Sequence, residues 1–453
     1  MQEKEFIQDL ESKVIEKLIG RFNLLQTDKE KQQVVTDALD EVCGHLERKL
    51  ILEEVKALET EEERKKFVKD FLSYDVIQDF LSDPDIEDII INSLNPIYVH
   101  HCQKGLVKTK YRFETQRQLD IFIKKLVIFC GRTELKKINN MELPNIQGRV
   151  NIIVSPLGPQ LTITKAKTEP LSMIDLVEKG TVTTDLAAQL WIYVEGLTVR
   201  PANIIISGGP GCGKTTLLNA LFSFVPENER MVIIEDTLEL NTQFEESCSR
   251  LESDENMDMT TLVKNSLRMR PDRVIVGEVR GAEAKDLMTV VNIGKHCIGT
   301  IHASSAREAI IRLQNEPMNV PEILVNLVDV FIVMKRFNFK DKVYRVAEEV
   351  VETGGMEQKT VLLSLIWNFD HKQNKFNQVS PSTIFRDKIS KTSGLSPKEI
   401  IEEVKVRSKV LSTLQERGIR SMKELTLFCR AYSKDPALTL SKLGLKREEI
   451  LQS

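Results

Sequence analysis

The sequence predicts an α/β protein in which a parallel sheet with helices on both faces follows a small α+β domain, with helical extensions at both ends of the chain. Three observations predict it. The chain of 453 residues is long enough for about three domains at ~150 residues each. Apolar runs typical of buried strands alternate with helical patterns after about residue 168, as in a parallel sheet between helices. The glycine-rich segment Gly208–Thr216 stands between one such strand and one such helix.

The overall composition indicates a globular chain. Apolar residues make up 41% of the sequence, charged residues make up 29%, and the formal net charge is -4. A dedicated nucleic-acid binder would be clearly basic, so this balance argues against one. The seven cysteines are scattered and odd in number, which suits free thiols in a reducing compartment. No apolar run approaches ~18 residues and the N-terminus lacks the apolar core of a signal peptide. We therefore expect a cytoplasmic protein whose membrane association runs through partners.

Residues 1–73 carry a helical pattern and form the expected N-terminal extension. Apolar side chains recur at four-residue spacing and so share one helix face. They are Phe6, Leu10, Val14 and Leu18. The charge-dense remainder is typical of a solvated helix surface, and a partner-docking arm is the alternative.

Residues 74–167 change to short apolar runs separated by turn residues, which predicts the small α+β domain. One amphipathic helix is expected at Leu119–Phe129. The expected strands are Asp88–Asn92, Ile97–His100, Arg149–Val154 and Leu161–Thr164.

Residues 168–378 carry the alternating strand and helix pattern of the main domain. The expected strands are Asn203–Ser207, Met231–Ile234, Val274–Val276, Cys297–Ile301 and Val330–Met334. Further short strand-like runs follow over residues 343–376.

Residues 379–453 form the C-terminal extension, which opens with a polar linker over about residues 379–394. The segment Ser396–Glu399 then fits a capping box with proline at the first helical position, a strong signal for a helix start. Gly418 ends that helix, and Ser421 opens the next one in the same way. The extension is therefore expected to be helical.

The segment Gly208–Thr216 fits the phosphate-binding P-loop pattern, a glycine, four residues, and then Gly-Lys-Ser/Thr. Its glycines let consecutive backbone N–H groups face an anion, and the helix N-terminus adds its positive end. Lys214 would reach the β- and γ-phosphates of a nucleotide, and the hydroxyl of Thr215 would ligate Mg²⁺. The alternative is a glycine-rich turn before an ordinary helix. The expected nucleotide-binding residues are Gly208, Gly209, Pro210, Gly211, Cys212, Gly213, Lys214, Thr215 and Thr216.

Acidic residues follow two expected strands downstream of this loop. Glu235 and Asp236 end one apolar run, with Glu239 three residues further, and Glu278 ends another. Hydrolysis of a bound nucleotide needs one carboxylate to orient water and another to organise Mg²⁺. For either acid group alone, a strand-end turn or a helix cap is the alternative. His302 follows a third strand and could face the same site, although a lone histidine there is usually structural.

Four ordered motifs then carry a specific resemblance. They are the P-loop, Ile-Glu-Asp with a later Glu-Leu, Arg-Pro-Asp-Arg-Val-Ile-Val-Gly-Glu-Val-Arg-Gly, and Gly-Thr-Ile-His-Ala. Over roughly residues 75–340 the chain resembles the type II/type IV secretion and type IV pilus-assembly ATPases, whose Walker A, Asp box, Walker B and His box follow in this order. Gly294-Lys295-His296-Cys297 and the helical tail resemble archaeal members more than bacterial ones. The resemblance implies a RecA-like P-loop domain preceded by a small PAS-like domain.

The resemblance also implies roles for the residues around the phosphates. Lys214, Thr215 and Thr216 match the family's phosphate and Mg²⁺ contacts. Glu278 matches the Walker B acid and, with Thr215, the metal site. In this family the strand ends in Gly-Glu rather than in the more usual Asp-Glu, so the metal contact of Glu278 would run through water. Arg280 matches the arginine after that acid, and His302 matches the His-box histidine.

Two further groups complete the site that the resemblance implies. Glu235 and Glu239 match the Asp-box acids, and Glu235 is expected to polarise the attacking water. The family is hexameric, and its small N-terminal domain lends arginines to the nucleotide site. Arg149 matches one of them. At the second position this chain has Thr164 followed by Lys165, and lysine does not offer the bidentate fork of arginine.

The expected function is therefore that of a cytoplasmic homo-hexameric motor that binds ATP and Mg²⁺ and hydrolyses ATP to ADP and phosphate. By resemblance, movement between its domains would drive pilus-like filament assembly or secretion through a polytopic inner-membrane platform protein. One alternative is a P-loop nucleic-acid translocase, against which the slightly acidic composition argues. The other is a nucleotide-gated scaffold without turnover, against which the two acid groups argue.

Overall fold

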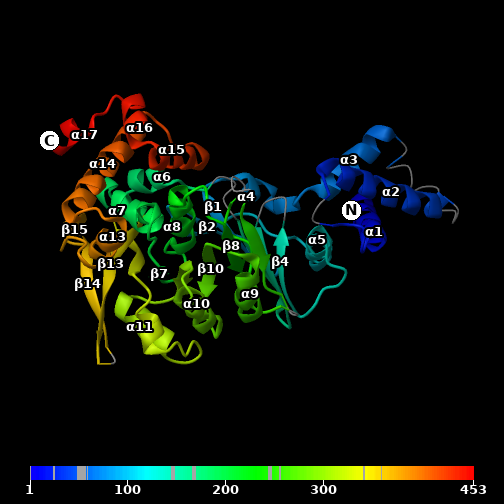
Figure 1. The fold of residues 1–453 in the computed structure, drawn as a ribbon. Coiled ribbons are helices and arrows are strands. Elements are labelled where there is room, and N and C mark those ends of the chain that lie inside the picture. Colours follow the sequence, from blue (N-terminus) through cyan, green and yellow to red (C-terminus); the bar gives the residue numbers. More distant parts are fainter. Residues whose placement is uncertain are drawn as a thin grey trace. The chain divides into compact units, whose positions relative to one another are not determined.

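The computed structural model describes residues 2–23, 26–47, 58, 60–143, 148–165, 170–242, 247–254, 257–339, 342–358 and 360–452. They form two compact units, Met1–Thr168 and Glu169–Ser453, and Figure 1 labels many of their elements. Each unit contains two of the four segments expected from the sequence. The boundary expected within each unit, at about residue 73 in the first and about residue 378 in the second, stays a prediction. Among the described helices, none is long and apolar enough to cross a membrane.

The first unit begins with helices that pack on the helix of the α+β domain. The helices of this unit are α1 (Gln2–Leu18), α2 (Asp28–Glu47), α3 (Glu61–Leu72), α4 (Gln78–Ser82) and α5 (Gln116–Phe129). Phe129 of α5 meets three aromatic rings, with centroid distances of 5.7 Å to Phe22, 6.3 Å to Phe71 and 5.9 Å to Tyr74. The N-terminal helices and the sheet therefore share one hydrophobic core. Of the predicted apolar face, Phe6 is partly buried and Leu10, Val14 and Leu18 are buried.

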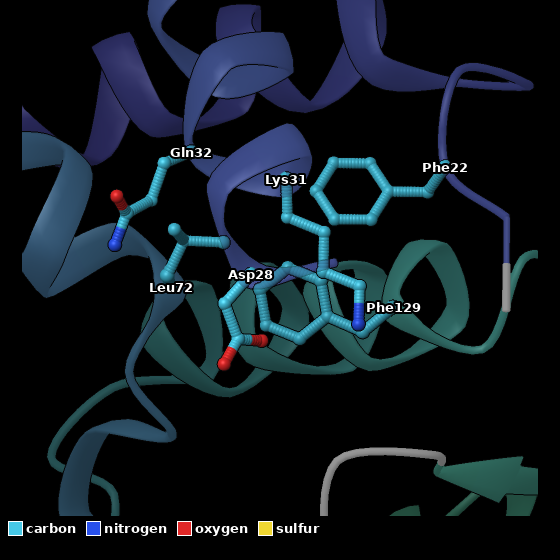
Figure 2. Close-up of a pocket in the computed structure, with 6 residues that line it drawn as sticks. All are labelled: Phe22, Asp28, Lys31, Gln32, Leu72 and Phe129. Carbon is cyan, nitrogen blue, oxygen red and sulfur yellow. The ribbon is translucent and has the colours of Figure 1, made fainter. Parts of the chain in front are cut away.

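A cavity of about 200 Å³ lies beside these rings. Figure 2 shows the residues that line it: Phe22, Asp28, Lys31, Gln32, Leu72 and Phe129.

A six-stranded antiparallel sheet completes the first unit. Its strands are β1 (Ile86–Asn92), β2 (Tyr98–His101), β3 (Gly105–Lys108), β4 (Ile138–Leu143), β5 (Gly148–Ser155) and β6 (Gly158–Thr164), in the order β3-β2-β1-β6-β5-β4. The predicted closing pair is confirmed as β5 and β6, which puts Arg149 directly opposite Thr164.

The second unit contains a nine-stranded sheet. Its strands are β7 (Ile204–Gly208), β8 (Met231–Glu235), β9 (Ser249–Glu252), β10 (Arg273–Val279), β11 (His296–Ile301), β12 (Val330–Phe339), β13 (Lys342–Glu357), β14 (Thr360–Asp370) and β15 (Lys375–Gln378), in the order β15-β14-β13-β12-β7-β11-β10-β8-β9. From β12 to β9 every neighbouring pair is parallel, so the C-terminal ends of these strands meet at one edge. From β12 to β15 the pairs are antiparallel.

All five predicted strands of the main domain are confirmed, but some are longer than expected. β10 continues past the expected end at Val276 to Val279, so Gly277 and Glu278 lie within this strand. β12 continues past the expected end at Met334 to Phe339. The expected short runs over residues 343–376 are instead long antiparallel strands. In the sequence these strands resemble short runs because polar and charged side chains interrupt their apolar residues.

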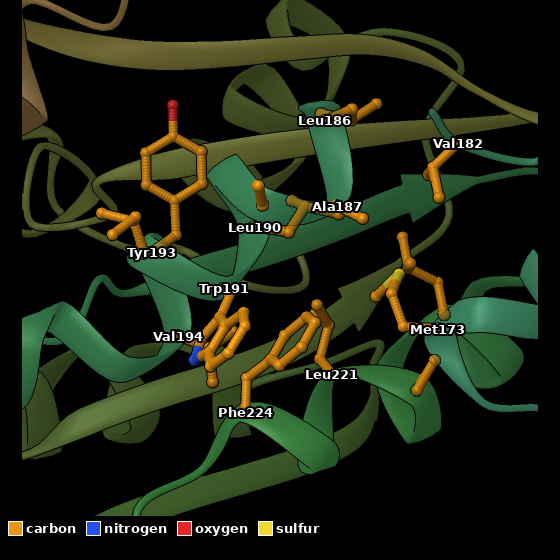
Figure 3. Close-up of a cluster of buried hydrophobic side chains, with 14 of the residues drawn as sticks. Met173, Val182, Leu186, Ala187, Leu190, Trp191, Tyr193, Val194, Leu221 and Phe224 are labelled. Carbon is orange, nitrogen blue, oxygen red and sulfur yellow. The ribbon is translucent and has the colours of Figure 1, made fainter. Parts of the chain in front are cut away.

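Helices cover both faces of this sheet. They are α6 (Met173–Glu178), α7 (Thr184–Glu195), α8 (Lys214–Leu221), α9 (Met259–Ser266), α10 (Glu283–Asn292), α11 (Ala306–Gln314) and α12 (Glu322–Val325). Successive side chains of β7 point to opposite faces: Ile204 and Ile206 enter the core with α7 and α8, and Ile205 enters the core with α9 and α10. Figure 3 shows the first core, where the rings of Trp191 and Phe224 stack at 5.3 Å.

The C-terminal helices belong to the same core as α7 and α8. They are α13 (Ile384–Ser393), α14 (Pro397–Glu416), α15 (Met422–Lys434), α16 (Pro436–Lys442) and α17 (Arg447–Gln452). The predicted capping box at Ser396 is present. The guanidinium group of Arg407 on α14 lies 4.5 Å from the ring centroid of Trp191 and forms an ion pair with the buried Glu195.

The prediction of a polar linker over residues 379–394 is wrong, because helix α13 occupies most of this segment. The N-terminal end of α13 is capped from a distance. The buried carboxylate of Glu352 on β13 accepts from the N–H groups of Ile384 and Phe385, each at 3.1 Å, and from the hydroxyl of Tyr193 at 2.7 Å. A cap more than thirty residues upstream leaves no local sequence signal, so the helix start was missed.

Candidate functional site

The P-loop segment connects the C-terminal end of β7 to α8, as the sequence predicts. Gly208, Gly211 and Gly213 adopt φ angles of +152°, +65° and +98°. A Cβ on Gly208 would lie 2.5 Å from Sγ of Cys212 and 2.5 Å from the carbonyl oxygen of Met334, so this turn requires glycine. The N-cap residue of α8 is Gly213, which has no side chain to cap the helix. An anion can therefore take the place of a side-chain cap at the N-terminal end of α8.

Lys214 begins α8, and its side chain bends back over the loop. Its Nζ donates to the carbonyl oxygens of Gly208 at 2.9 Å and Gly209 at 3.1 Å, and it lies 3.3 Å from Nδ1 of His302. Burial lowers the pKa of Lys214 because it removes water from the ammonium group. An anion at the loop would stabilise the charged ammonium and compete with the carbonyl oxygens for it.

Four more side chains continue from Lys214 along the C-terminal edge of the sheet. Nε2 of His302 lies 2.8 Å from Oε1 of Glu278. Arg280 binds Glu278 through two hydrogen bonds, from Nε to Oε1 at 2.6 Å and from Nη2 to Oε2 at 2.7 Å. Nη1 of Arg280 lies 3.4 Å from Oδ2 of Asp236. We call this connected set, from Lys214 through His302, Glu278 and Arg280 to Asp236, the edge relay.

The charge state of Glu278 is set by its neighbours in the edge relay. Burial alone would raise its pKa, but the hydrogen bonds and charge of Arg280 lower it, and the charges of His302 and Lys214 lower it further. The net effect is a pKa below the usual value for glutamate. Both oxygens of this ionised carboxylate are engaged, so a metal ion would reach it through water.

Glu235 is the last residue of β8, and its side chain is buried. Its Oε1 accepts from the N–H groups of Glu239 and Leu240, each at 3.0 Å, and its Oε2 lies 3.4 Å from Nη2 of Arg250. Burial raises the pKa of Glu235 to about 7, although the two N–H groups and Arg250 oppose the rise. The carboxyl group therefore exchanges a proton near neutral pH.

The position of Glu235 explains the Gly-Glu ending of β10. A Cβ on Gly277 would lie 2.9 Å from Cγ of Glu235, closer than carbon atoms approach without a shift. The space in which an aspartate side chain would begin is thus filled by Glu235. The unusual ending before Glu278 follows from packing between two neighbouring strands.

Oxygen ligands suited to Mg²⁺ stand beside the P-loop. Oγ1 of Thr215 and Oε2 of Glu239 are 3.5 Å apart, and hydroxyl and carboxylate oxygens are ligands that Mg²⁺ accepts. In the part of the chain that the structure describes, no group of three or more His, Cys, Asp or Glu side chains could hold a metal ion by itself. The residues fit an ion that shares its ligands with phosphate oxygens and water.

The predicted cations of the first unit lie on its sheet. Arg149 is half-buried on β5, and its contact with a nucleotide stays a prediction. The hydroxyl of Thr164 donates to Asp88 at 2.8 Å. Nζ of Lys165 donates to the carbonyl oxygen of Phe80 at 3.0 Å, and burial lowers the pKa of Lys165. Lys165 is thus bound at the end of α4 within its own unit.

Three arginines near the site were not predicted. Arg250 pairs with Glu235 from β9, a strand without an apolar run to mark it. Nε of Arg345 donates to the carbonyl oxygen of Gly211 at 2.9 Å. A Cβ on Gly211 would lie 3.5 Å from Nη1 of Arg336. Arg336 lies where β12 extends beyond its expected end at Met334, and Arg345 lies on β13 within the region of the expected short runs. No sequence pattern marks either arginine.

The chain matches the family described as type II/IV secretion system protein over residues 75–336. An uncharacterized protein of Methanocaldococcus jannaschii is 30% identical over 405 residues, which is 85% of this chain and 72% of that protein. The conjugal transfer protein TrbB of Rhizobium radiobacter is 28% identical over 56% of this chain and 81% of its own length.

Among solved structures, the ATPase DotB of Legionella pneumophila is 18% identical with a TM-score of 0.45, over 75% of this chain and 86% of that one. The VirB11 ATPase of the Brucella suis type IV secretion system, in complex with sulphate, is 23% identical with a TM-score of 0.33. It covers 63% of this chain and 96% of its own.

Proposed function

Because the chain belongs to the family of type II/IV secretion system proteins, we propose that it is a hexameric motor ATPase. It hydrolyses MgATP to ADP and phosphate. The energy drives assembly of a type IV pilus-like filament, or protein secretion, through a membrane platform protein.

The edge relay is the observation that carries the ATPase proposal. A phosphate-binding loop alone accounts only for nucleotide binding, whereas hydrolysis needs charged groups that sense and stabilise the terminal phosphate. Here the P-loop lysine is connected through His302 to the acid Glu278 over contacts of 3.3 Å and 2.8 Å. Movement of Lys214 onto a phosphate would remove its contact with His302 and so change the surroundings of Glu278.

The remaining residues have separate tasks in this proposal. The N–H groups at the start of α8 and Lys214 bind the phosphates. Glu235 orients the attacking water and accepts its proton, for which a pKa of about 7 is well suited because it lies near the operating pH. Arg280 keeps Glu278 ionised and in place.

Mg²⁺, when bound, neutralises charge on the β- and γ-phosphates. Thr215 and Glu239 would hold it together with those phosphates, and Glu278 would contact it through water. The proposal therefore expects turnover to require a divalent cation.

The proposed partners are five further copies of the chain and a polytopic inner-membrane platform protein. The protein would act in the cytoplasm, held at the membrane through that partner. Arg149 of one copy would complete the nucleotide site of the next. Sedimentation with nucleotide should then give a particle of about six times the 51.7 kDa chain mass, and a monomer under those conditions would count against the hexamer.

The test of the ATPase proposal is phosphate release from the purified full chain and two variants. Lys214→Ala and Glu278→Gln should each abolish turnover. Glu278→Gln should still bind nucleotide, because it leaves the P-loop intact, whereas Lys214→Ala should bind it poorly. Lys335→Ala removes an exposed lysine whose partner is Glu348 and should keep full activity. Near-normal turnover in both site variants would refute the proposal.

A further inference from the structure

The β12–β13 extension, residues 335–345 as far as they are described, reaches beyond the sheet edge at which the P-loop lies. β12 runs parallel to β7 only as far as Met334, which pairs with Gly208, the last residue of β7. β12 then continues to Phe339 in its pairing with β13. The extension therefore stands beside the loop that follows Gly208.

Two arginines stand opposite each other on this extension. Arg336 of β12 pairs directly with Arg345 of β13. Because side chains alternate along a strand, both arginines share a sheet face with Met334 and Ala347, which belong to the same hydrophobic cluster as α8. This face turns them toward the P-loop, where Arg345 reaches the carbonyl oxygen of Gly211 at 2.9 Å.

The charge around the loop is accordingly positive on several sides. Two guanidinium groups directly opposite each other on neighbouring strands repel. The ammonium group of Lys214 and the N-terminal end of α8 add positive charge to the same region. An anion with several oxygen atoms would stabilise all of these groups together, and guanidinium groups bind phosphate oxygens in a fixed fork geometry.

We propose that Arg336 and Arg345 are nucleotide-binding residues that contact the phosphate chain of a nucleoside di- or triphosphate bound to the same subunit. This inference rests on the proposed function and adds two residues to its site. The arginines come from the unit that carries the P-loop, so they differ from Arg149, which would act from a neighbouring copy. On nucleotide binding, Arg345 exchanges the carbonyl oxygen of Gly211 for a phosphate oxygen.

The test is calorimetric titration of the full chain with ADP and Mg²⁺. Arg336→Ala and Arg345→Gln should each weaken ADP binding about tenfold or more, as expected for loss of a charge-assisted hydrogen bond. Lys335→Ala, which removes a positive charge from the adjacent position on the other face of β12, should bind ADP as the wild type does.

Arg345→Gln separates a phosphate contact from a merely structural role. The amide nitrogen of glutamine stands as many bonds from Cα as Nε of arginine, so the shorter side chain of this variant can still donate to Gly211. If Arg345 only shapes the loop, Arg345→Gln binds ADP normally and Arg345→Ala alone is impaired, which would overturn the inference. Equal unfolding midpoints for the variants and the wild type check that each still folds.

The outcome also distinguishes this inference from the proposed function. If the wild type binds and hydrolyses ATP while Arg336→Ala and Arg345→Gln bind ADP within about twofold of it, the inference fails and the function stands. If the wild type itself neither binds nor hydrolyses ATP, the function fails, and this inference fails with it.

Discussion

Replacing Glu235 by glutamine should change how the stability of the second unit depends on pH. Glutamine keeps an oxygen that can accept from the N–H groups of Glu239 and Leu240, but it cannot ionise. In the wild type, burial raises the pKa of Glu235 from 4.5 to about 7, so the folded chain holds a proton that the unfolded chain releases. The stabilising contribution is complete below about pH 4.5 and is lost as the pH rises through about 7.

The magnitude follows from the size of that shift. At roughly 1.36 kcal/mol per pKa unit, a rise from 4.5 to about 7 is worth about 3 kcal/mol of the free energy of unfolding. About 2.5 kcal/mol of it is lost between about pH 5 and pH 8.5. The difference in unfolding free energy between Glu235→Gln and the wild type should therefore grow by about 2.5 kcal/mol over this range in favour of the variant. The new amide beside Arg250 adds a cost that does not vary with pH and cancels in this comparison.

Urea unfolding followed by tryptophan fluorescence is the suitable assay. The chain has two tryptophans, and both Trp191 and Trp367 lie in the second unit with Glu235, so the signal reports that unit. Glu416→Gln, at an exposed position on α14, is the matched control and should follow the wild-type pH dependence. Parallel pH profiles for Glu235→Gln and the wild type would refute the assignment of a near-neutral pKa to this carboxyl group.

Three further changes have expected outcomes. Gly277→Ala brings a Cβ to 2.9 Å from Cγ of Glu235 and should reduce phosphate release about tenfold or more by displacing that carboxylate; unchanged release would show that the contact relaxes freely. Glu352→Ala removes the buried cap of α13 and should lower the free energy of unfolding by about 3 kcal/mol, with Glu352→Gln losing less; equal losses would contradict the capping role. Arg407→Leu leaves the carboxylate of Glu195 buried without its ion pair and should lower the free energy of unfolding by about 3–5 kcal/mol in the same urea assay. A decrease of less than about 1 kcal/mol would show that this carboxylate is solvated.

The sequence was most informative where chemistry and strand pattern coincide. The P-loop glycines are needed for positive φ angles. Glu235 is the last residue of β8, and Glu278 is the last but one of β10, so a local pattern marks each of these residues. The parallel strands β7, β8, β10 and β11 each contain a short run of buried apolar residues, which explains why their positions were predictable.

The rest depends on contacts between segments far apart in the chain. The extension of β12 beyond Met334 is held by pairing with β13, not by its own apolar content, so Arg336 and Arg345 were not found. The cap of α13 comes from Glu352 on a distant strand. The burial of Glu235 raises its pKa, and its side chain leaves no room for a Cβ at position 277. Both effects depend on packing between neighbouring strands, which no local pattern reveals.

The packing of α7 against the C-terminal helices has a consequence for synthesis of the chain. Asp185 on α7 accepts a hydrogen bond at 2.5 Å from Ser408, which lies 223 residues later. The ring of Trp191, also on α7, is covered by the guanidinium group of Arg407. While a ribosome makes the intervening sheet, the apolar face of α7 has no C-terminal partner. In nascent chains stalled before α14, α7 should therefore be accessible to proteases and to chaperones that bind apolar segments. Protection of α7 in such chains would show that the P-loop sheet folds without its last helices.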